Sequence, residues 1–345
     1  MNEQKTNIGI KLVSRGTDSI LPSKKYEWKE IIRSSKLPVL FETKERENNL
    51  AQWITDNRGI LNQKLHESGA ILFRGFDLHT DEDFINFLNQ DNFEMLSYLE
   101  RSSPRTAIAK NVFTSTTYPK DEIIALHNEN SASKIIAKRL WFFCSEASEK
   151  GGETPLADAR KVLKAIDTEV VEKFRSLGWM LIRNYSDVLG YSWEKAFSGL
   201  NKADVERYCR VNSIDFRWKE DNILWTKQTR PSTLIHPITG EEAWFNHIAF
   251  WHSSNLPTEI RSMMQDEVGE EGMPYDVRYG DGSKIEDDIA KHLRNAYLKE
   301  KVKFSWRNGD LLLVDNILTC HGRESYSGSR KVRVAMTDSF IRTDL

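Results

Sequence analysis

The sequence has few cysteines and no long hydrophobic segment. Cys144, Cys209 and Cys320 are widely spaced, which excludes a disulfide framework and a CxxC metal site and indicates a reducing compartment. We interpret the three as small buried hydrophobic residues. No stretch approaches the roughly 18 apolar residues that a membrane helix needs, and charged and amide residues near the start interrupt any secretory signal. We therefore expect a cytoplasmic protein without a membrane partner.

An excess of charge of one sign is also absent. The 49 lysine and arginine residues are matched by 51 aspartate and glutamate residues, which gives a formal net charge of −2. A broad cationic surface for nucleic acid is therefore not indicated. Hydrophobic residues make up 39% of the 345 residues, and this is enough to bury a large core.

Hydrophobic periodicity predicts helices among short strands, without a βαβ repeat. The expected helices cover residues 45–67, 81–89, 159–176 and 284–300, the last two with N-caps at Asp158 and Ser283. The expected strands cover residues 70–73, 123–126, 139–144, 179–185, 243–246, 302–306, 311–316 and 331–342. Residues 94–121 and 215–240 are predicted as loops and irregular strand. This order favours a β-sandwich or barrel with helical insertions.

A polar triplet follows the apolar strand IIAL. Because side chains at positions i and i+2 of a strand share a face, His127 and Glu129 can point at one ion. An imidazole and a carboxylate would supply two of three ligands for a divalent metal. Taken alone the triplet is a weak signal, since ordinary surface polar residues explain it better.

Two further features raise the value of this triplet. His321 follows a strand and a turn near the end of the chain, and Arg330 opens the final strand. A buried arginine needs an anionic partner, and its planar fork matches a carboxylate. The loop Gly151–Gly152 permits a tight turn that presents the hydroxyl of Thr154.

These motifs together resemble one family. The segments LHNENS, GGETPLADAR and DNILTCHGR are similar to those of the iron(II)- and 2-oxoglutarate-dependent oxygenases of the taurine dioxygenase (TauD/TfdA) and clavaminate synthase type. The resemblance runs from the segment ILFRGF at 71–76 through the final strand. It implies a mostly β fold with helical insertions around a double-stranded β-helix, a jelly-roll core resembling the cupins. It also implies one domain over residues 1–345, with an N-terminal α/β part at about 38–120 and a metal-bearing core at about 121–345.

The resemblance also implies the roles of single residues. By this likeness His127, Glu129 and His321 bind iron(II) (Fe2+), while Thr154 and Arg330 hold the distal carboxylate of 2-oxoglutarate. Two imidazoles and one carboxylate leave three positions of an octahedral ion open, enough for 2-oxoglutarate and dioxygen (O2). The family reaction couples decarboxylation of 2-oxoglutarate to succinate with oxidation of a second substrate.

The residues of these and two further segments narrow the class of substrate that the resemblance implies. GGETPLADAR, WFNHIAFWH and YGDGSKIE resemble a subgroup of natural product pathways that hydroxylates an unactivated C–H bond of an amino acid, free or tethered to a carrier protein. Glu129 keeps the carboxylate that halogenating relatives lack, which argues against halogenation. Val334 stands where taurine dioxygenases have a sulfonate-binding arginine, so a sulfonate substrate is disfavoured. Arg333 is expected on the opposite strand face from Arg330.

Several residues are candidates for contact with an amino-acid-like small molecule. They lie in segments that line the mouth of the pocket if the resemblance holds, and ordinary core or loop roles explain each of them equally well: Asn130, Arg230, Trp244, Asn246 and His247.

Other functions stay open from the sequence. The same oxygenase chemistry can lead to desaturation, epoxidation or oxidative cyclisation. A zinc hydrolase would also use two histidines and one glutamate, but it gives no reason for Thr154 and Arg330. A non-catalytic jelly-roll binding protein is the third alternative, and the intact triad speaks against it.

Overall fold

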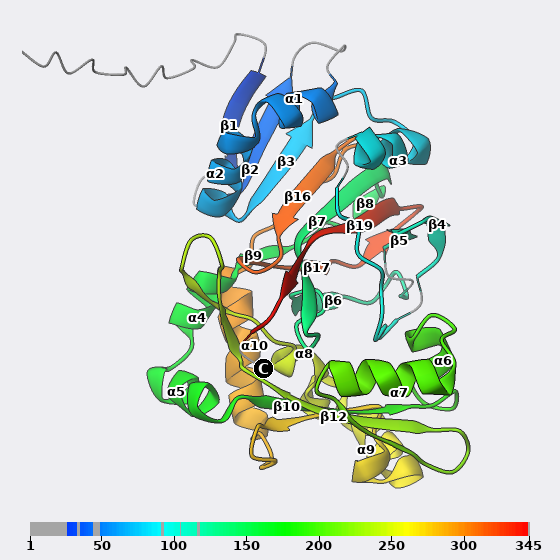
Figure 1. Ribbon diagram of the computed structural model, residues 1–345. Coiled ribbons are helices and arrows are strands. Elements are labelled where there is room, and N and C mark those ends of the chain that lie inside the picture. Colours follow the sequence, from blue (N-terminus) through cyan, green and yellow to red (C-terminus); the bar gives the residue numbers. More distant parts are fainter. Residues whose placement is uncertain are drawn as a thin grey trace, which may run out of the picture.

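The structure is a computed structural model that describes residues 26–32, 35–43, 49–90, 93–103, 105–115 and 118–343. Most of the regular structure is sheet, with helices packed at both ends (Figure 1). The prediction of a mostly β chain with helical insertions is confirmed at this level.

The largest sheet joins the two ends of the described chain. In order of pairing its strands are β1 (Tyr26–Ile32), β2 (Ser35–Thr43), β3 (Ala70–Arg74), β16 (Leu311–Asp315), β7 (Ile135–Glu146), β19 (Lys331–Ile341), β5 (Val112–Thr114) and β4 (Ala107–Ala109). All pairs are antiparallel except β2 with β3. Every residue of β16 is buried, as expected for an apolar strand in the middle of a sheet. Strands from before and after residue 120 therefore share one sheet.

Three helices lie over the N-terminal end of this sheet (Figure 1): α1 (Leu50–Asp56), α2 (Arg58–Ser68) and α3 (Asp81–Gln90). The helix expected over 45–67 is divided at Asn57, and residues 44–48 lie outside the described part. The side chain of Asn49 accepts a hydrogen bond from the main-chain N–H of Gln52 and caps α1. Gly69 ends α2 in the left-handed conformation, with φ of 80°.

A second sheet forms the opposite end of the molecule. It consists of β11 (Asp215–Trp218), β12 (Leu224–Arg230), β10 (Trp179–Tyr185) and β15 (Tyr275–Tyr279), with the hairpin of β13 (Thr233–Ile235) and β14 (Glu242–Trp244) nearby in the chain. The expectation of irregular structure over 215–240 is wrong. The buried positions of β12 include Thr226, Gln228 and Arg230, so its inward face is polar and hydrophobic alternation gives no signal.

The helices around this sheet are α6 (Trp193–Ala196), α7 (Lys202–Val211), α8 (Ile248–Trp251) and α9 (Thr258–Val268), with the short 3-10 turns η1 (Ser253–Asn255) and η2 (Glu270–Gly272). Another group comprises α4 (Ala159–Ala165), α5 (Thr168–Leu177) and α10 (Asp287–Glu300). Asp158 caps α4 as predicted. The helix expected over 159–176 is two helices. Ser283 is not the N-cap of α10, which begins after Glu286, and the Ser283 hydroxyl donates to Asp281 in the preceding turn.

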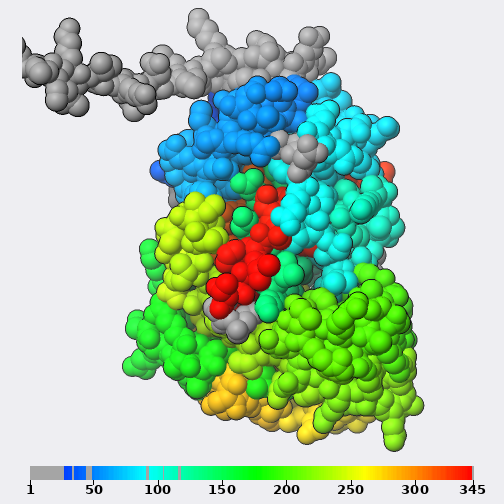
Figure 2. Space-filling model, viewed as in Figure 1, coloured from blue at the N-terminus to red at the C-terminus, as the bar shows by residue number. Residues whose placement is uncertain are grey.

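Between the two ends lies a small sheet of β6 (Ile124–His127), β17 (Thr319–Arg323) and β9 (Leu156–Asp158), beside the pair β8 (Lys150–Gly151) and β18 (Tyr326–Ser327). Residues 302–306 form no strand, and only Val302 makes an isolated bridge, to Leu156. In Figure 2 the red C-terminal segment reaches the surface between cyan and yellow-green parts of the chain. The three cysteines are free and buried, as predicted.

No helix in the described ranges combines the length and the apolar character that crossing a membrane requires.

A buried ion pair fixes the centre of the large sheet. Arg74 at the end of β3 donates two hydrogen bonds to Asp310, at 2.8 and 2.7 Å, and Asp310 is 1% exposed. We expect Arg74→Met to lower the free energy of unfolding by about 3–5 kcal/mol, because it leaves a buried carboxylate without its cation. Urea denaturation measures this change. Lys284→Met, which removes the exposed pair with Glu270, is the control and should have little effect. Equal losses in both variants would contradict the prediction.

Candidate active site

The small central sheet brings two of the predicted metal ligands together. His127 ends β6 and is the direct cross-strand partner of His321 on β17. The two imidazole centroids lie 4.5 Å apart. Glu129 follows two residues after His127, and one potential ligand atom from each of the three side chains lies within 4.8 Å of the others. All three residues are buried, at 5–9% exposure.

The protonation states of this cluster suit a metal. His127 Nδ1 lies 2.8 Å from the carbonyl oxygen of Ala125, which can only accept, so Nδ1 carries the proton and Nε2 keeps a free lone pair. Burial lowers the pKa of His127 and, more strongly, that of His321, so both rings are neutral near pH 7. Nδ1 of His321 is buried without a hydrogen-bond partner in the part of the chain that the structure describes.

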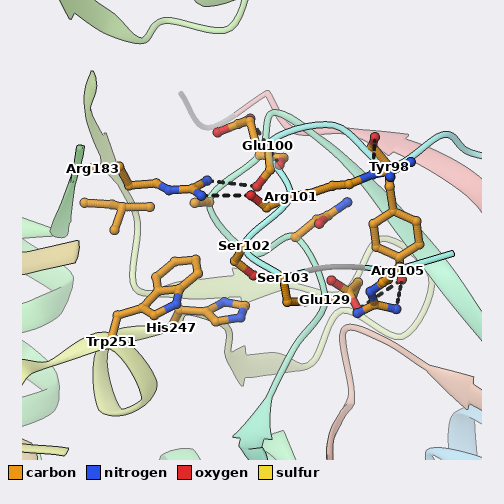
Figure 3. A pocket seen from close by; sticks show the side chains of 14 residues that line it. Tyr98, Glu100, Arg101, Ser102, Ser103, Arg105, Glu129, Arg183, His247 and Trp251 are labelled. Atoms are coloured by element: carbon orange, nitrogen blue, oxygen red, sulfur yellow. Dashed lines mark hydrogen bonds and ion pairs between the residues drawn. The ribbon is translucent and has the colours of Figure 1, made fainter. Parts of the chain in front are cut away.

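Glu129 is held by a pair that the sequence did not reveal. Arg105 donates to Oε2 of Glu129 at 2.9 Å, and the hydroxyl of Tyr98 donates to the same oxygen at 3.1 Å (Figure 3). Burial alone would raise the pKa of Glu129, but the charge of Arg105 and the hydrogen bond from Tyr98 hold this pKa below its ordinary value. Tyr98 and Arg105 lie in the segment 94–121, whose lack of periodicity gave no reason to single them out.

A second group of predicted residues lines a pocket that reaches the histidines. Thr154 and Arg330 belong to its walls, together with Arg105, Ser115, Ile124, His127, Phe142, His321, Gly322, Arg323 and Val332. The Nε of Arg330 donates to the carbonyl oxygen of Gly152 at 2.8 Å. No carboxylate of the described ranges lies within ion-pair distance of Arg330. Burial lowers its pKa to about 10, so it remains a cation at neutral pH.

The hydroxyl of Thr154 is oriented by Trp306. The indole Nε1 donates to Thr154 Oγ at 3.1 Å, so the hydroxyl hydrogen of Thr154 is left to donate to another acceptor. Thr154 is 2% exposed. A buried cation without an anion and a hydroxyl free to donate fit a carboxylate at this end of the pocket. These residues therefore fit 2-oxoglutarate, and the donor set of two imidazoles and one carboxylate fits iron(II).

A second pocket is lined by Arg105, which it shares with the first pocket, and by Glu129 (Figure 3). Two predicted substrate residues, Asn130 and His247, are among its lining residues. The ring of His247 stacks on Trp251 with centroids 4.1 Å apart, and its Nδ1 lies 2.5 Å from the hydroxyl of Ser131. The remaining lining residues are Tyr98, Glu100, Arg101, Ser102, Ser103, Ala132, Ser133, Leu181 and Arg183.

The other three residues expected at the pocket mouth are not among the residues that line either pocket. Arg230 is 2% exposed and donates to carbonyl oxygens that include those of Ala132 and Asn212. Trp244 is fully buried in the hydrophobic core. Nδ2 of Asn246 donates to the carbonyl oxygen of Ser232, and its Oδ1 accepts from the main-chain N–H of Ile248. Arg333, left out of the predicted site, forms a two-point ion pair with Asp81.

Another cluster of His66, His236 and Asp315 has the composition of a metal site. Nδ1 of His236 accepts a hydrogen bond from the main-chain N–H of Thr239 at 3.0 Å, so the proton of this ring sits on Nε2 and is donated to Asp315 at 3.1 Å. Both ring nitrogens of His236 therefore take part in hydrogen bonds, and neither is left to bind a metal. His236 and Asp315 form a hydrogen-bonded structural pair.

The comparison with known proteins agrees with the geometry of the site. The model of the family "Taurine catabolism dioxygenase TauD, TfdA family" matches residues 33–336. The chain belongs to the TauD/TfdA family. A family member of this kind is an iron(II)- and 2-oxoglutarate-dependent dioxygenase, so its cofactors are Fe2+, 2-oxoglutarate and O2.

Two relatives match most of this TauD/TfdA chain. The chain is 40% identical over 278 residues to the dapdiamide synthesis protein DdaC of Enterobacter agglomerans, and the match covers 81% of this chain and 84% of DdaC. A clavaminate synthase-like protein of Arabidopsis thaliana is 28% identical, with 83% and 86% covered.

Among solved structures, PvcB of Pseudomonas aeruginosa aligns with a TM-score of 0.51 at 15% identity, covering 92% of this chain and 93% of PvcB. AAD-2 in complex with Mn(II) and N-oxalylglycine aligns with a TM-score of 0.53 at 13% identity, covering 93% and 100%. These two likenesses support the fold of the TauD/TfdA chain.

Gly152 provides a test of how Arg330 is positioned. A Cβ at Gly152 would lie 3.0 Å from Cδ of Arg330 and 2.4 Å from Oγ of Ser148. We expect Gly152→Ala to displace the guanidinium and weaken binding of 2-oxoglutarate about tenfold, roughly 1.4 kcal/mol. Calorimetric titration of the Mn(II)-loaded protein under anaerobic conditions measures this affinity.

Gly240→Ala is the matched control for this substitution. Gly240 has the same φ of +71°, but no atom lies within 4 Å of a Cβ built there. The two glycines have the same φ, so the variants differ in the contacts of the new Cβ at residue 152 with Ser148, Arg330 and Tyr326. Equal affinities in the two variants would show that Gly152 does not position Arg330.

Proposed function

We propose that this dioxygenase couples decarboxylation of 2-oxoglutarate to succinate with hydroxylation of an unactivated C–H bond in an amino acid or amino-acid-derived molecule. The observation that carries the proposal is a buried cluster of two neutral histidines and one carboxylate beside a buried arginine that has no carboxylate partner in the described chain. In this proposal His127, Glu129 and His321 bind iron, and Thr154 and Arg330 bind the distal carboxylate of 2-oxoglutarate. The bound iron supplies the activation of dioxygen and the oxidation of the substrate.

The chain's own residues have defined tasks in this proposal. Arg330 and Thr154 orient 2-oxoglutarate at one end of its pocket. Arg105 lies between the two pockets and balances the charge of Glu129. The stacked rings of His247 and Trp251 cover one side of the second pocket and keep bulk water from the reacting atoms.

The second pocket supports an amino-acid-like substrate. Its lining offers a cation at Arg101, an anion at Glu100 and hydroxyls at Ser102 and Ser103. Groups of both signs suit a molecule that carries an amine and a carboxylate. Asn130 and His247 would contact this molecule from the metal side. The relationship to a dapdiamide synthesis protein supports a role in assembling an amino-acid-derived product.

The proposal extends to the setting of the reaction. The substrate would be free or tethered to a carrier protein, and the enzyme would act in the cytoplasm as one domain built around a double-stranded β-helix core. The likeness to PvcB and AAD-2 supports this architecture. The mass of the product separates oxygen insertion from desaturation and ring closure, because hydroxylation and epoxidation add one oxygen atom whereas desaturation and ring closure remove two hydrogen atoms.

Turnover of 2-oxoglutarate tests the proposal. We expect the wild-type protein to form succinate only when iron(II) and dioxygen are both present, and His127→Ala to reduce this to background because the metal loses a ligand. Succinate is measured by mass spectrometry while an electrode follows oxygen consumption.

His292→Ala serves as the control for loss of a histidine, since its ring contacts the main chain at Asp167, outside both pockets. It should leave turnover unchanged. Turnover retained in His127→Ala, or succinate formation by a zinc-loaded protein without iron, would overturn the metal assignment.

A further inference from the structure

We propose that Asn128 and Asn316 act as a reciprocal amide clamp that sets the distance between Glu129 and His321, and that both are positioning residues for the metal. This inference rests on the proposed function, because it concerns the ligands assigned there. Each asparagine is 0% exposed. The side chain of each forms hydrogen bonds with main-chain groups of the segment in which the other asparagine lies.

Asn316 binds both main-chain polar groups of Glu129. Its Oδ1 accepts from the N–H of Glu129 at 2.8 Å, and its Nδ2 donates to the carbonyl oxygen of Glu129 at 3.0 Å. The same Nδ2 donates to the carbonyl oxygen of Ala137 at 2.9 Å, at the start of β7. One planar amide therefore fixes the carboxylate residue against the large sheet.

Asn128 holds the opposite segment. Its Nδ2 donates to the carbonyl oxygen of Asn316 at 2.7 Å and lies 3.4 Å from that of Thr319. Its Oδ1 accepts from the thiol of Cys320 at 3.2 Å. These partners are the turn and the two residues that lead directly into His321.

The need for such a clamp follows from where the strands end. β6 stops at His127, so Asn128 and Glu129 lie beyond the ladder that holds the two histidines opposite each other. Residues 316–318 form the turn between β16 and β17 and also lie outside the ladder. Sheet pairing positions His127 and His321, whereas the two side-chain amides position Glu129 relative to them.

The hydrogen bonds also indicate that Asn128 and Asn316 position the metal ligands and do not bind the metal themselves. The oxygen and both N–H donors of Asn316 are used within the protein, and Asn128 likewise engages both ends of its amide. Neither side chain lines a pocket described above. Their effect on a metal would therefore pass through Glu129 and His321, in the way that residues behind metal ligands typically change affinity 10–100-fold.

The experiment measures Mn(II) affinity of the full chain, from the electron paramagnetic resonance signal of the free ion, together with the melting temperature of the metal-free protein. We expect Asn316→Ala to weaken Mn(II) binding about 10–100-fold. Asn316→Asp keeps the acceptor for the Glu129 N–H but turns a carboxylate oxygen toward the carbonyl oxygens of Glu129 and Ala137, so it should weaken binding as well. Asn128→Ala should weaken binding in the same range while leaving the contacts of Asn316 with Glu129 in place, so it decides the question if Asn316→Ala does not fold.

Asn184→Ala is the matched control. Asn184 is also buried, and its Nδ2 donates to two carbonyl oxygens, those of Glu271 and Met273, in the distant sheet. It should lower the melting temperature without weakening Mn(II) binding. A purely structural role for the clamp would give the same pattern in Asn128→Ala and Asn316→Ala as in the control, and that result would overturn the inference.

The wild-type titration separates the two levels of the proposal. If the wild-type protein binds no Mn(II), the metal assignment fails and the clamp fails with it. If the wild type binds Mn(II) and the Asn128 and Asn316 variants bind it equally well, the clamp alone is overturned and the proposed function stands.

Discussion

The pairing of β6 with β17 places His127 directly opposite His321, and this register governs the geometry around it. Antiparallel partners hold their side chains about 5 Å apart on one face, close enough for two imidazoles to share an ion. A shift of one residue would turn one imidazole to the other face. Leu156 pairs with His321 on the far side, so β9 brings the loop with Thr154 to the same place.

Buried charge is distributed unevenly around these histidines. Arg105 is neutralised by Glu129, whereas Arg330, which lines the same pocket, donates to a carbonyl oxygen and has no carboxylate partner in the described chain. A buried cation is costly unless an anion compensates it. This distribution of charge fits the proposed binding of an anion at Arg330 and of a metal ion at Glu129.

The candidate metal ligands could be predicted from the sequence because they lie in short motifs at the ends of apolar strands. His127, Glu129 and His321 are examples, and the structure brings their side chains into one cluster. Two glycines before Thr154 and the apolar strand after Arg330 drew attention to these two residues in the sequence.

The residues that support the site were harder to predict. Arg105 comes from a segment without periodicity, and β12 buries a polar face, so neither gives a hydrophobic pattern. Arg230 looked like a substrate contact, but its position at the end of that polar strand directs it to main-chain carbonyls. Asn128 and Asn316 act through tertiary hydrogen bonds, which no local pattern encodes.

The central claim is that iron(II) and 2-oxoglutarate bind side by side at the His127–Glu129–His321 cluster, and visible absorption under anaerobic conditions tests it most directly. Addition of both to the metal-free protein should produce the weak metal-to-ligand charge-transfer band of the iron and 2-oxoglutarate complex, and Arg330→Ala should lose this band at the same concentrations. Absence of the band in the folded wild-type protein, or an undiminished band in Arg330→Ala, would contradict the account.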